Sequence, residues 1–153
     1  MYLCRKKVNP MKKILLSAIL ALSAAGAWAQ SDSTAFRGYL ENTEFGIYLR
    51  INFYDKDIQI PGQDYYGPLP GYLGKVNNPF CWVFVEAEVK SPHEARLTVI
   101  NDYGSEDLQA TLTRDNDSIY TLRQGSGSTI KVPRDNKWFK LPRNIEFRRV
   151  NGR

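Results

Sequence analysis

Residues 47–54 read Ile47-Tyr48-Leu49-Arg50-Ile51-Asn52-Phe53-Tyr54, and this stretch decides the fold class. Its apolar positions follow a period of two, so Ile47, Leu49, Ile51 and Phe53 share one face. Successive side chains of a β-strand point to opposite faces of a sheet, whereas a helix needs a period near 3.6. The stretch therefore predicts a strand with one buried face and one face toward water.

The same alternation recurs along the chain after residue 30, with polar breakers between its segments. We expect further strands at residues 36–41, 57–60, 81–90, 95–101, 108–113, 119–124, 129–132, 138–141 and 145–150. Gly, Asn, Asp and Ser gather at residues 101–105, 115–118 and 125–128, and these residue types favour hairpin turns. Helical periodicity is absent after residue 30, so the pattern is typical of an antiparallel meander.

Residues 81–90 differ from the other expected strands because their first half is apolar on both faces. Strict alternation would place Cys81, Val83, Val85, Ala87 and Val89 on one face, and Trp82, Phe84, Glu86 and Glu88 on the other. The two glutamates indicate where the outer face meets water. We therefore expect the first half of this strand to lie beneath a loop or at a closed end of the barrel.

This number of short strands predicts an all-β fold, an antiparallel meander of about eight to ten strands closed into a small barrel. Closure is favoured because it removes exposed sheet edges. A two-sheet β-sandwich is the alternative. Residues 30–153 are long enough to bury a core of their own, and we expect them to form a single domain.

The strand pattern resembles the calycin class of small ligand-binding barrels. Phe36-Arg37-Gly38-Tyr39-Leu40 lies where lipocalins carry a first-strand Gly-x-Trp, but here Tyr39 and Leu40 follow the glycine and the tryptophan is absent. The resemblance implies a fold and transfers no functional residue. The leader and the size of the chain are also similar to those of uncharacterised small exported proteins of Gram-negative bacteria.

Residues 11–29 have the three parts of a cleavable signal peptide. Met11-Lys12-Lys13 gives a positive start, residues 14–25 are almost entirely apolar, and Ala27-Trp28-Ala29 is a small-x-small cleavage site before Gln30. The apolar run is shorter than the roughly 20 residues that a membrane-spanning helix needs. We expect a periplasmic or secreted protein with no membrane span, and we interpret residues 1–10 as a start assigned too early.

The leader also accounts for the charge of the chain. Five of the 21 basic residues precede Gln30 and none of the 16 acidic residues does, so the remainder is formally neutral. The overall charge of +5 therefore gives no support for nucleic-acid binding. Of the two cysteines only Cys81 follows the leader, so we expect no intrachain disulfide and a buried, inert thiol.

Residues 61–80 interrupt the alternation with four prolines, four glycines and three tyrosines. Prolines cannot lie inside a sheet, while the aromatic side chains need cover, so we predict an irregular packed loop. Such loops often bind ligands. We predict Tyr65, Tyr66, Tyr72 and Trp82 as ligand-binding residues at the mouth of the barrel; the alternative is a loop that only plugs one end.

Catalytic and metal signatures are weak, and we assign no catalytic residue, metal or cofactor. His93 fits an exposed turn, and residues 115–117 lack the later ligands of a calcium loop. Glu86 with Glu88 or Asp64 could suit glycoside hydrolysis, but same-face glutamates are common on a wet strand. Residues 137–143 mix aromatic and basic side chains, which suits anionic sugars or nucleic acid, although strand alternation explains them equally well.

These observations favour a non-catalytic exported binding module that holds a small apolar ligand, a glycan or a protein partner. A structural or accessory protein of the cell envelope, including an inhibitor of an envelope enzyme, is the alternative. A glycan hydrolase is a third hypothesis.

The leader yields a direct test. We expect the protein recovered from the exported fraction of its host to have the intact mass of residues 30–153, because the cleavage site lies after Ala29. Intact mass spectrometry with sequencing of the N-terminal peptide measures this. A protein that retains residues 11–29 would contradict the expected cleavage.

Overall fold

Ten β-strands run through residues 34–153, the part of the chain that the computed structural model describes. Residues 1–10 and the predicted signal peptide lie outside the described residues. The strands are β1 (Arg37–Asn42), β2 (Ile47–Asn52), β3 (Gly71–Lys75), β4 (Asn78–Ser91), β5 (Glu94–Asn101), β6 (Asp107–Arg114), β7 (Ile119–Gly127), β8 (Lys131–Arg134), β9 (Lys137–Lys140) and β10 (Asn144–Val150). A short 3₁₀ turn, η1 (Asp64–Tyr66), precedes β3. Within this part of the chain, no helix has the length and apolarity needed to cross a bilayer.

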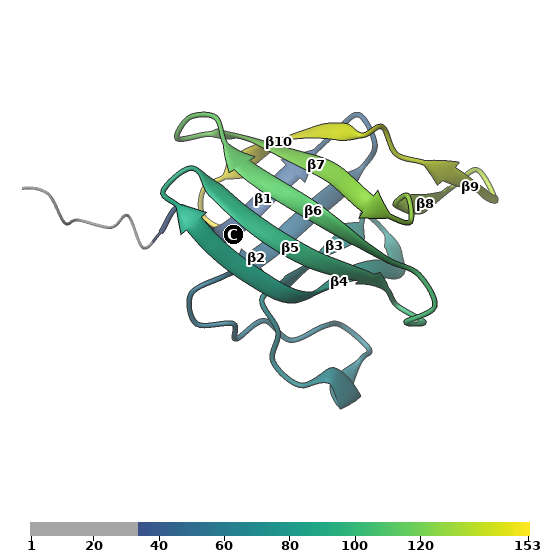
Figure 1. Ribbon diagram of the computed structural model, residues 1–153. Coiled ribbons are helices and arrows are strands. Elements are labelled where there is room, and N and C mark those ends of the chain that lie inside the picture. Colours follow the sequence, from purple (N-terminus) through teal and green to yellow (C-terminus); the bar gives the residue numbers. More distant parts are fainter. Residues whose placement is uncertain (1–33) are drawn as a thin grey trace, which may run out of the picture. The chain divides into compact units, whose positions relative to one another are not determined.

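Eight of the strands form a closed antiparallel barrel in the order β1-β10-β7-β6-β5-β4-β3-β2 (Figure 1). The first and last strands pair with each other, with Tyr39 opposite Val150 and Glu41 opposite Arg148, and this pairing closes the barrel. Consecutive barrel strands are neighbours, apart from the step from β7 to β10. The predicted all-β barrel in meander order is therefore confirmed, and it is consistent with a calycin-like fold.

The inward side chains fill the barrel. Trp82 and Phe84 from β4, Tyr120 from β7 and Phe147 from β10 are each at most 1% exposed. An eight-stranded barrel is just wide enough to be filled by side chains or to hold one small ligand. Here the large rings fill the interior, which is therefore a packed core.

Residues before β1 cover one end of the barrel. Phe36 is fully buried and stacks on Phe53, with ring centroids 5.7 Å apart. The Tyr120 hydroxyl donates to the Ala35 carbonyl at 2.5 Å, and the Arg149 guanidinium donates to the same carbonyl at 2.7 Å and to the Tyr120 hydroxyl. Hydrogen bonds from β7 and β10 thus hold the start of the domain across this opening.

The hairpin of β8 and β9 covers the opposite end and lies outside the barrel ladder (Figure 1). Its turn residues Asp135 and Asn136 both have positive φ, as a tight two-residue hairpin turn requires. Gln124 of β7, which is 5% exposed, anchors the hairpin. Its side chain accepts a bond from the Ile130 N–H at 2.7 Å and donates to the Pro142 carbonyl at 2.9 Å.

Strand β3 lies inside the segment predicted to be irregular, and that prediction is wrong for Gly71–Lys75 and for the start of β4. Two glycines make this strand hard to recognise from the sequence, because glycine is uncommon in strands. A Cβ at Gly71 would lie 2.3 Å from the Arg50 carbonyl oxygen, and one at Gly74 would lie 2.4 Å from the Tyr48 ring. Both positions need glycine because a neighbouring group lies where a side chain would project.

The strand predicted at 57–60 is absent, and only an isolated bridge joins Ile58 to Leu69. The Asn52 side chain donates to the carboxylates of Asp55 at 3.2 Å and Asp57 at 2.8 Å, which folds the chain into a turn. Lys56, between those aspartates, has a φ of 52°, outside the extended region that a strand requires.

The predicted assignment of side chains to the two faces of residues 81–90 is wrong in part, because β4 contains a β-bulge. Phe84 lies opposite Val99 and Glu86 lies opposite Thr98, so Val85 is an extra residue. The alternation changes phase there: Trp82 and Phe84 face the core before the bulge, and Ala87 faces it afterwards. The predicted outward position of the two glutamates is confirmed, whereas the single face of Cys81 to Val89 is not continuous.

We expect Gln124→Ala to lower the free energy of unfolding by about 2–4 kcal/mol, because it leaves buried backbone groups of the hairpin without partners. Urea denaturation followed by circular dichroism measures this. Gln109→Ala is the matched control on the exposed face of β6, with an expected change below about 0.5 kcal/mol. Equal effects of the two substitutions would contradict the anchoring role.

Candidate binding pocket at the hairpin end

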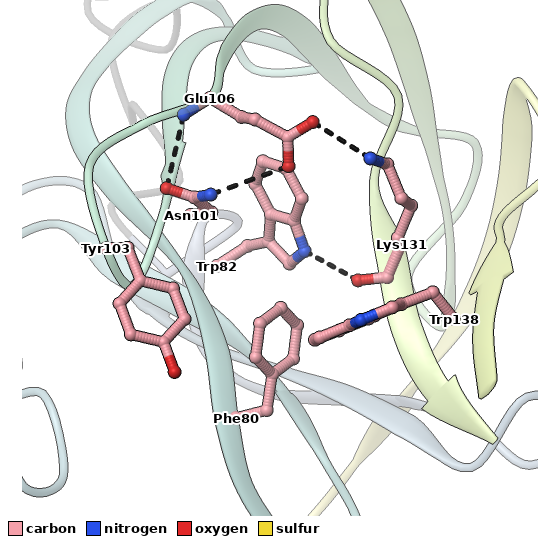
Figure 2. Close-up of a pocket in the computed structure, with 7 residues that line it drawn as sticks. All are labelled: Phe80, Trp82, Asn101, Tyr103, Glu106, Lys131 and Trp138. Carbon is pink, nitrogen blue, oxygen red and sulfur yellow. Dashed lines mark hydrogen bonds and ion pairs between the residues drawn. The ribbon is translucent and has the colours of Figure 1, made fainter. Parts of the chain in front are cut away.

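A half-open pocket of about 220 Å³ lies where the β8–β9 hairpin meets the barrel (Figure 2). We call it the end pocket. Its walls come from β4, from the end of β5 and the turn that follows, and from both strands of the hairpin. The lining residues are Phe80, Trp82, Asn101, Tyr103, Glu106, Lys131 and Trp138.

One side of the end pocket is aromatic. The rings of Phe80 and Trp138 meet edge to face with centroids 4.9 Å apart, and Phe80 makes a wider edge contact with Trp82. Trp138 is 59% exposed and Tyr103 is 83% exposed, although both are large side chains that proteins usually cover. Exposed rings at the rim of a pocket are typical of binding sites.

The other side is polar. Lys131 Nζ donates to a carboxylate oxygen of Glu106 (Figure 2). The distance to Glu106 Oε1 is 2.9 Å, and the Lys131 and Glu106 side chains are 32% and 33% exposed. Asn101 Nδ2 lies 3.5 Å from the second carboxylate oxygen of Glu106. Opposite charges therefore lie side by side at the pocket wall, and both stay in contact with solvent.

Asn101 holds this wall in place. It is 6% exposed, and its side-chain oxygen accepts bonds from the backbone N–H groups of Ser105 at 2.8 Å and Glu106 at 3.3 Å. An asparagine that bonds its own backbone in this way stabilises a turn. The turn predicted at 101–105 is thereby confirmed, and its geometry places Glu106 opposite Lys131.

Trp82 forms the floor of the end pocket and fixes the hairpin to the barrel. It is 1% exposed, and its indole N–H donates to the Lys131 carbonyl at 2.8 Å. Lys131 therefore bonds Trp82 of the core through its backbone and Glu106 of the polar wall through its side chain. Of the four residues predicted to bind a ligand, Trp82 is the one that lines the end pocket.

The structure places Tyr65, Tyr66 and Tyr72 on the outer wall of the barrel and not at its mouth. Tyr72 is 5% exposed and packs with Ile60, Cys81 and Val83, outside the main core. Tyr65 is 73% exposed and stacks on Tyr66 with centroids 4.4 Å apart. The segment after β2 thus covers the outside of β3 and β4, as predicted for the apolar first half of 81–90.

Sequence reasoning did not single out the polar wall, because Asn101, Tyr103 and Glu106 read as an ordinary turn. The stretch 137–143 did carry a signal through its mixture of rings and charges. Alternation places Phe139 against the core, where it contacts Phe45, and turns Trp138 outward into the end pocket. Strand alternation thus explains both positions: it buries Phe139 and places Trp138 at the end pocket.

The carboxylates of the hydrolase hypothesis do not form an enclosed pair. Glu86 and Glu88 lie on the open outer face of β4, and Asp64 lies on the exposed turn η1. Glu88 bonds Lys90 at 2.7 Å, and this contact lowers the pKa of Glu88. A general acid in glycoside hydrolysis needs a raised pKa, so this contact does not suit Glu88 to that role.

Other chemical groups occupy ordinary positions. His93 is exposed in the turn between β4 and β5. The Asn116 side-chain oxygen accepts bonds from the N–H groups of Ser118 and Ile119, both at 2.9 Å, which makes 115–118 a turn as predicted. Among residues 34–153, no cluster of His, Cys, Asp and Glu side chains has the arrangement needed to hold a metal ion.

Cys81 lies beneath the outer loop, as expected for a buried thiol. Burial raises the pKa of Cys81 to about 11, and the negative charge of Asp102 acts in the same direction. Burial also raises the pKa of the Asp102 carboxyl, whose Oδ1 atom has no hydrogen-bond partner. Both groups belong to the packing of the outer wall and not to the end pocket.

No protein family, curated protein or solved structure matches this chain. The assignment of this chain to the all-β barrels therefore rests on its structure alone.

We expect the Cys81 thiol to react slowly with Ellman's reagent in the folded protein, because little thiolate exists well below a pKa of about 11. The C4S variant leaves Cys81 as the only thiol. At pH 8 the folded rate should be at least about 100-fold below the rate in urea, and it should rise steadily with pH. Equal rates in the folded and unfolded protein would contradict the buried position.

Proposed function

We propose that the protein is a non-catalytic binding module that acts outside the cytoplasm and holds a small ligand in the end pocket. The observation that carries this proposal is a concave site with exposed rings on one side and an ion pair on the other. Such a combination of apolar area and a few placed polar groups is typical of small-molecule sites.

The filled interior supports a ligand at the end of the barrel. Calycin-like barrels suit ligands held in the interior, but here Trp82, Phe84 and Phe147 occupy that space. The end pocket is smaller than the 300–1,000 Å³ of sites for drug-sized ligands. A ligand of about one ring therefore fits the site best.

The position of the rings supports the same proposal. Strand alternation in the β8–β9 hairpin turns position 138 outward, but it does not require a large aromatic side chain there. Covering Trp138 and Tyr103 with a ligand removes apolar area from water at little cost in ordering, since the Trp82 and Gln124 bonds already hold the hairpin.

The leader pattern of residues 11–29 supports the location, because its three parts match a secretory signal. Cys81 also suits an oxidising compartment, since it is buried and the other cysteine precedes the cleavage site.

A fragment screen tests the binding function, with the indole ¹⁵N–¹H signals of Trp82 and Trp138 as reporters. We expect fragments that shift both signals and that bind Trp138→Ala at least about 10-fold more weakly, since an anchoring ring commonly contributes more than 1 kcal/mol. Tyr65→Ala is the matched control, because it removes an exposed ring from the outer wall. Fragments that all respond to Tyr65→Ala and not to Trp138→Ala would place binding on the outer loop and contradict the proposal.

A further inference from the structure

The ion pair of the end pocket makes its wall electrically neutral. Glu106 and Lys131 are 2.9 Å apart and each is about one-third exposed. An anionic or cationic ligand would have to compete with this pair for one of its members. A neutral ligand bonds to both groups and leaves the pair intact.

The same wall offers donors and acceptors next to each other. A carboxylate accepts through about four lone-pair sites and a lysine donates through three N–H groups. The bond between Lys131 Nζ and Glu106 Oε1 uses one of each, and Asn101 reaches Glu106 only at 3.5 Å. Hydroxyl groups suit this wall, because one hydroxyl both donates to a carboxylate and accepts from an ammonium group.

The aromatic side requires a ligand that also has a flat apolar face. The face of an aromatic ring is negative, so it attracts C–H groups polarised by neighbouring oxygen atoms. A purely apolar ligand would satisfy Trp138 and Phe80 but would remove water from Glu106 and Lys131 without replacing its hydrogen bonds. The ligand therefore needs hydroxyl groups at its edge and C–H groups on its face.

A sugar ring combines these properties within the size of the end pocket. We propose that the end pocket binds a neutral pyranose ring, whose hydroxyl groups bond to Glu106 and Lys131 while its C–H face packs against Trp138. The half-open shape leaves room for the ring to be one residue of a longer glycan. This inference rests on the proposed binding function and adds the class of ligand.

Three kinds of probe of similar size test the proposal. They are the methyl glycosides of glucose, galactose, mannose and N-acetylglucosamine; glucuronate, in which a carboxylate replaces the hydroxymethyl group of glucose; and cyclohexanol, which keeps a six-membered ring but has one hydroxyl group. Saturation-transfer NMR detects binding to the full chain, and titrations give dissociation constants. We expect at least one neutral glycoside to bind more tightly than glucuronate and cyclohexanol.

Two variants connect that preference to the residues. Trp138→Ala should weaken the glycoside at least about 10-fold, as expected for loss of an anchoring ring, whereas Tyr65→Ala should leave it unchanged. Glu106→Gln keeps the size of the side chain but leaves Lys131 without its anionic partner. The ratio of glucuronate to glycoside affinity should then rise at least about fivefold, an effect that simple loss of structure would not produce. Circular dichroism verifies that each variant is folded.

The outcomes separate the ligand class from the binding function. If cyclohexanol or glucuronate binds wild-type protein more tightly than every glycoside, and Trp138→Ala weakens it, the pocket binds ligands but the sugar proposal is wrong. If no probe loses affinity in Trp138→Ala, and the fragment screen finds no Trp138-dependent binder either, both proposals are wrong. A glycoside that binds equally well to Glu106→Gln, with no gain for glucuronate, would also overturn the sugar proposal.

Discussion

The narrow interior of an eight-stranded barrel is the constraint on which the rest of this structure depends. Closure between β1 and β10 leaves a space that side chains can just fill, and large rings from β4, β7 and β10 fill it. The interior therefore contributes stability through close packing. Ligand contact, if the barrel has it, must occur at an end or on the outer wall.

The filled barrel has two ends, and a different segment of the chain covers each of them. Residues before β1 cover one end, where the Arg149 guanidinium and the Tyr120 hydroxyl bond the Ala35 carbonyl. The β8–β9 hairpin covers the other, held by Gln124 and by the bond from Trp82 to Lys131. The end pocket lies along the edge of the second cover. Covering the core and forming the pocket are thus tasks of the same few residues.

Most of the barrel could be predicted from the period of two, because one face of each strand must be buried while the other meets water. The errors arise where local geometry departs from that rule. An extra residue at Val85 reverses the alternation within β4, and two glycines in β3 remove the side chains that would reveal a strand. The end pocket was harder to predict because its residues come from four segments, which only barrel closure and the hairpin bring together. Of the residues predicted to bind a ligand, Trp82 lines the end pocket, whereas Glu106 carried no signal in a polar turn.

The β8–β9 hairpin forms no ladder with the barrel strands, and its tip is a two-residue turn of Asp135 and Asn136. Substitutions or insertions at that tip leave every barrel hydrogen bond in place, provided that the Lys131 carbonyl and the Gln124 contacts remain. The tip of the hairpin can therefore change without a change to the barrel ladder. Under the proposed binding function, selection or a protein engineer could change the specificity of the end pocket through a few hairpin residues while the barrel strands stay constant.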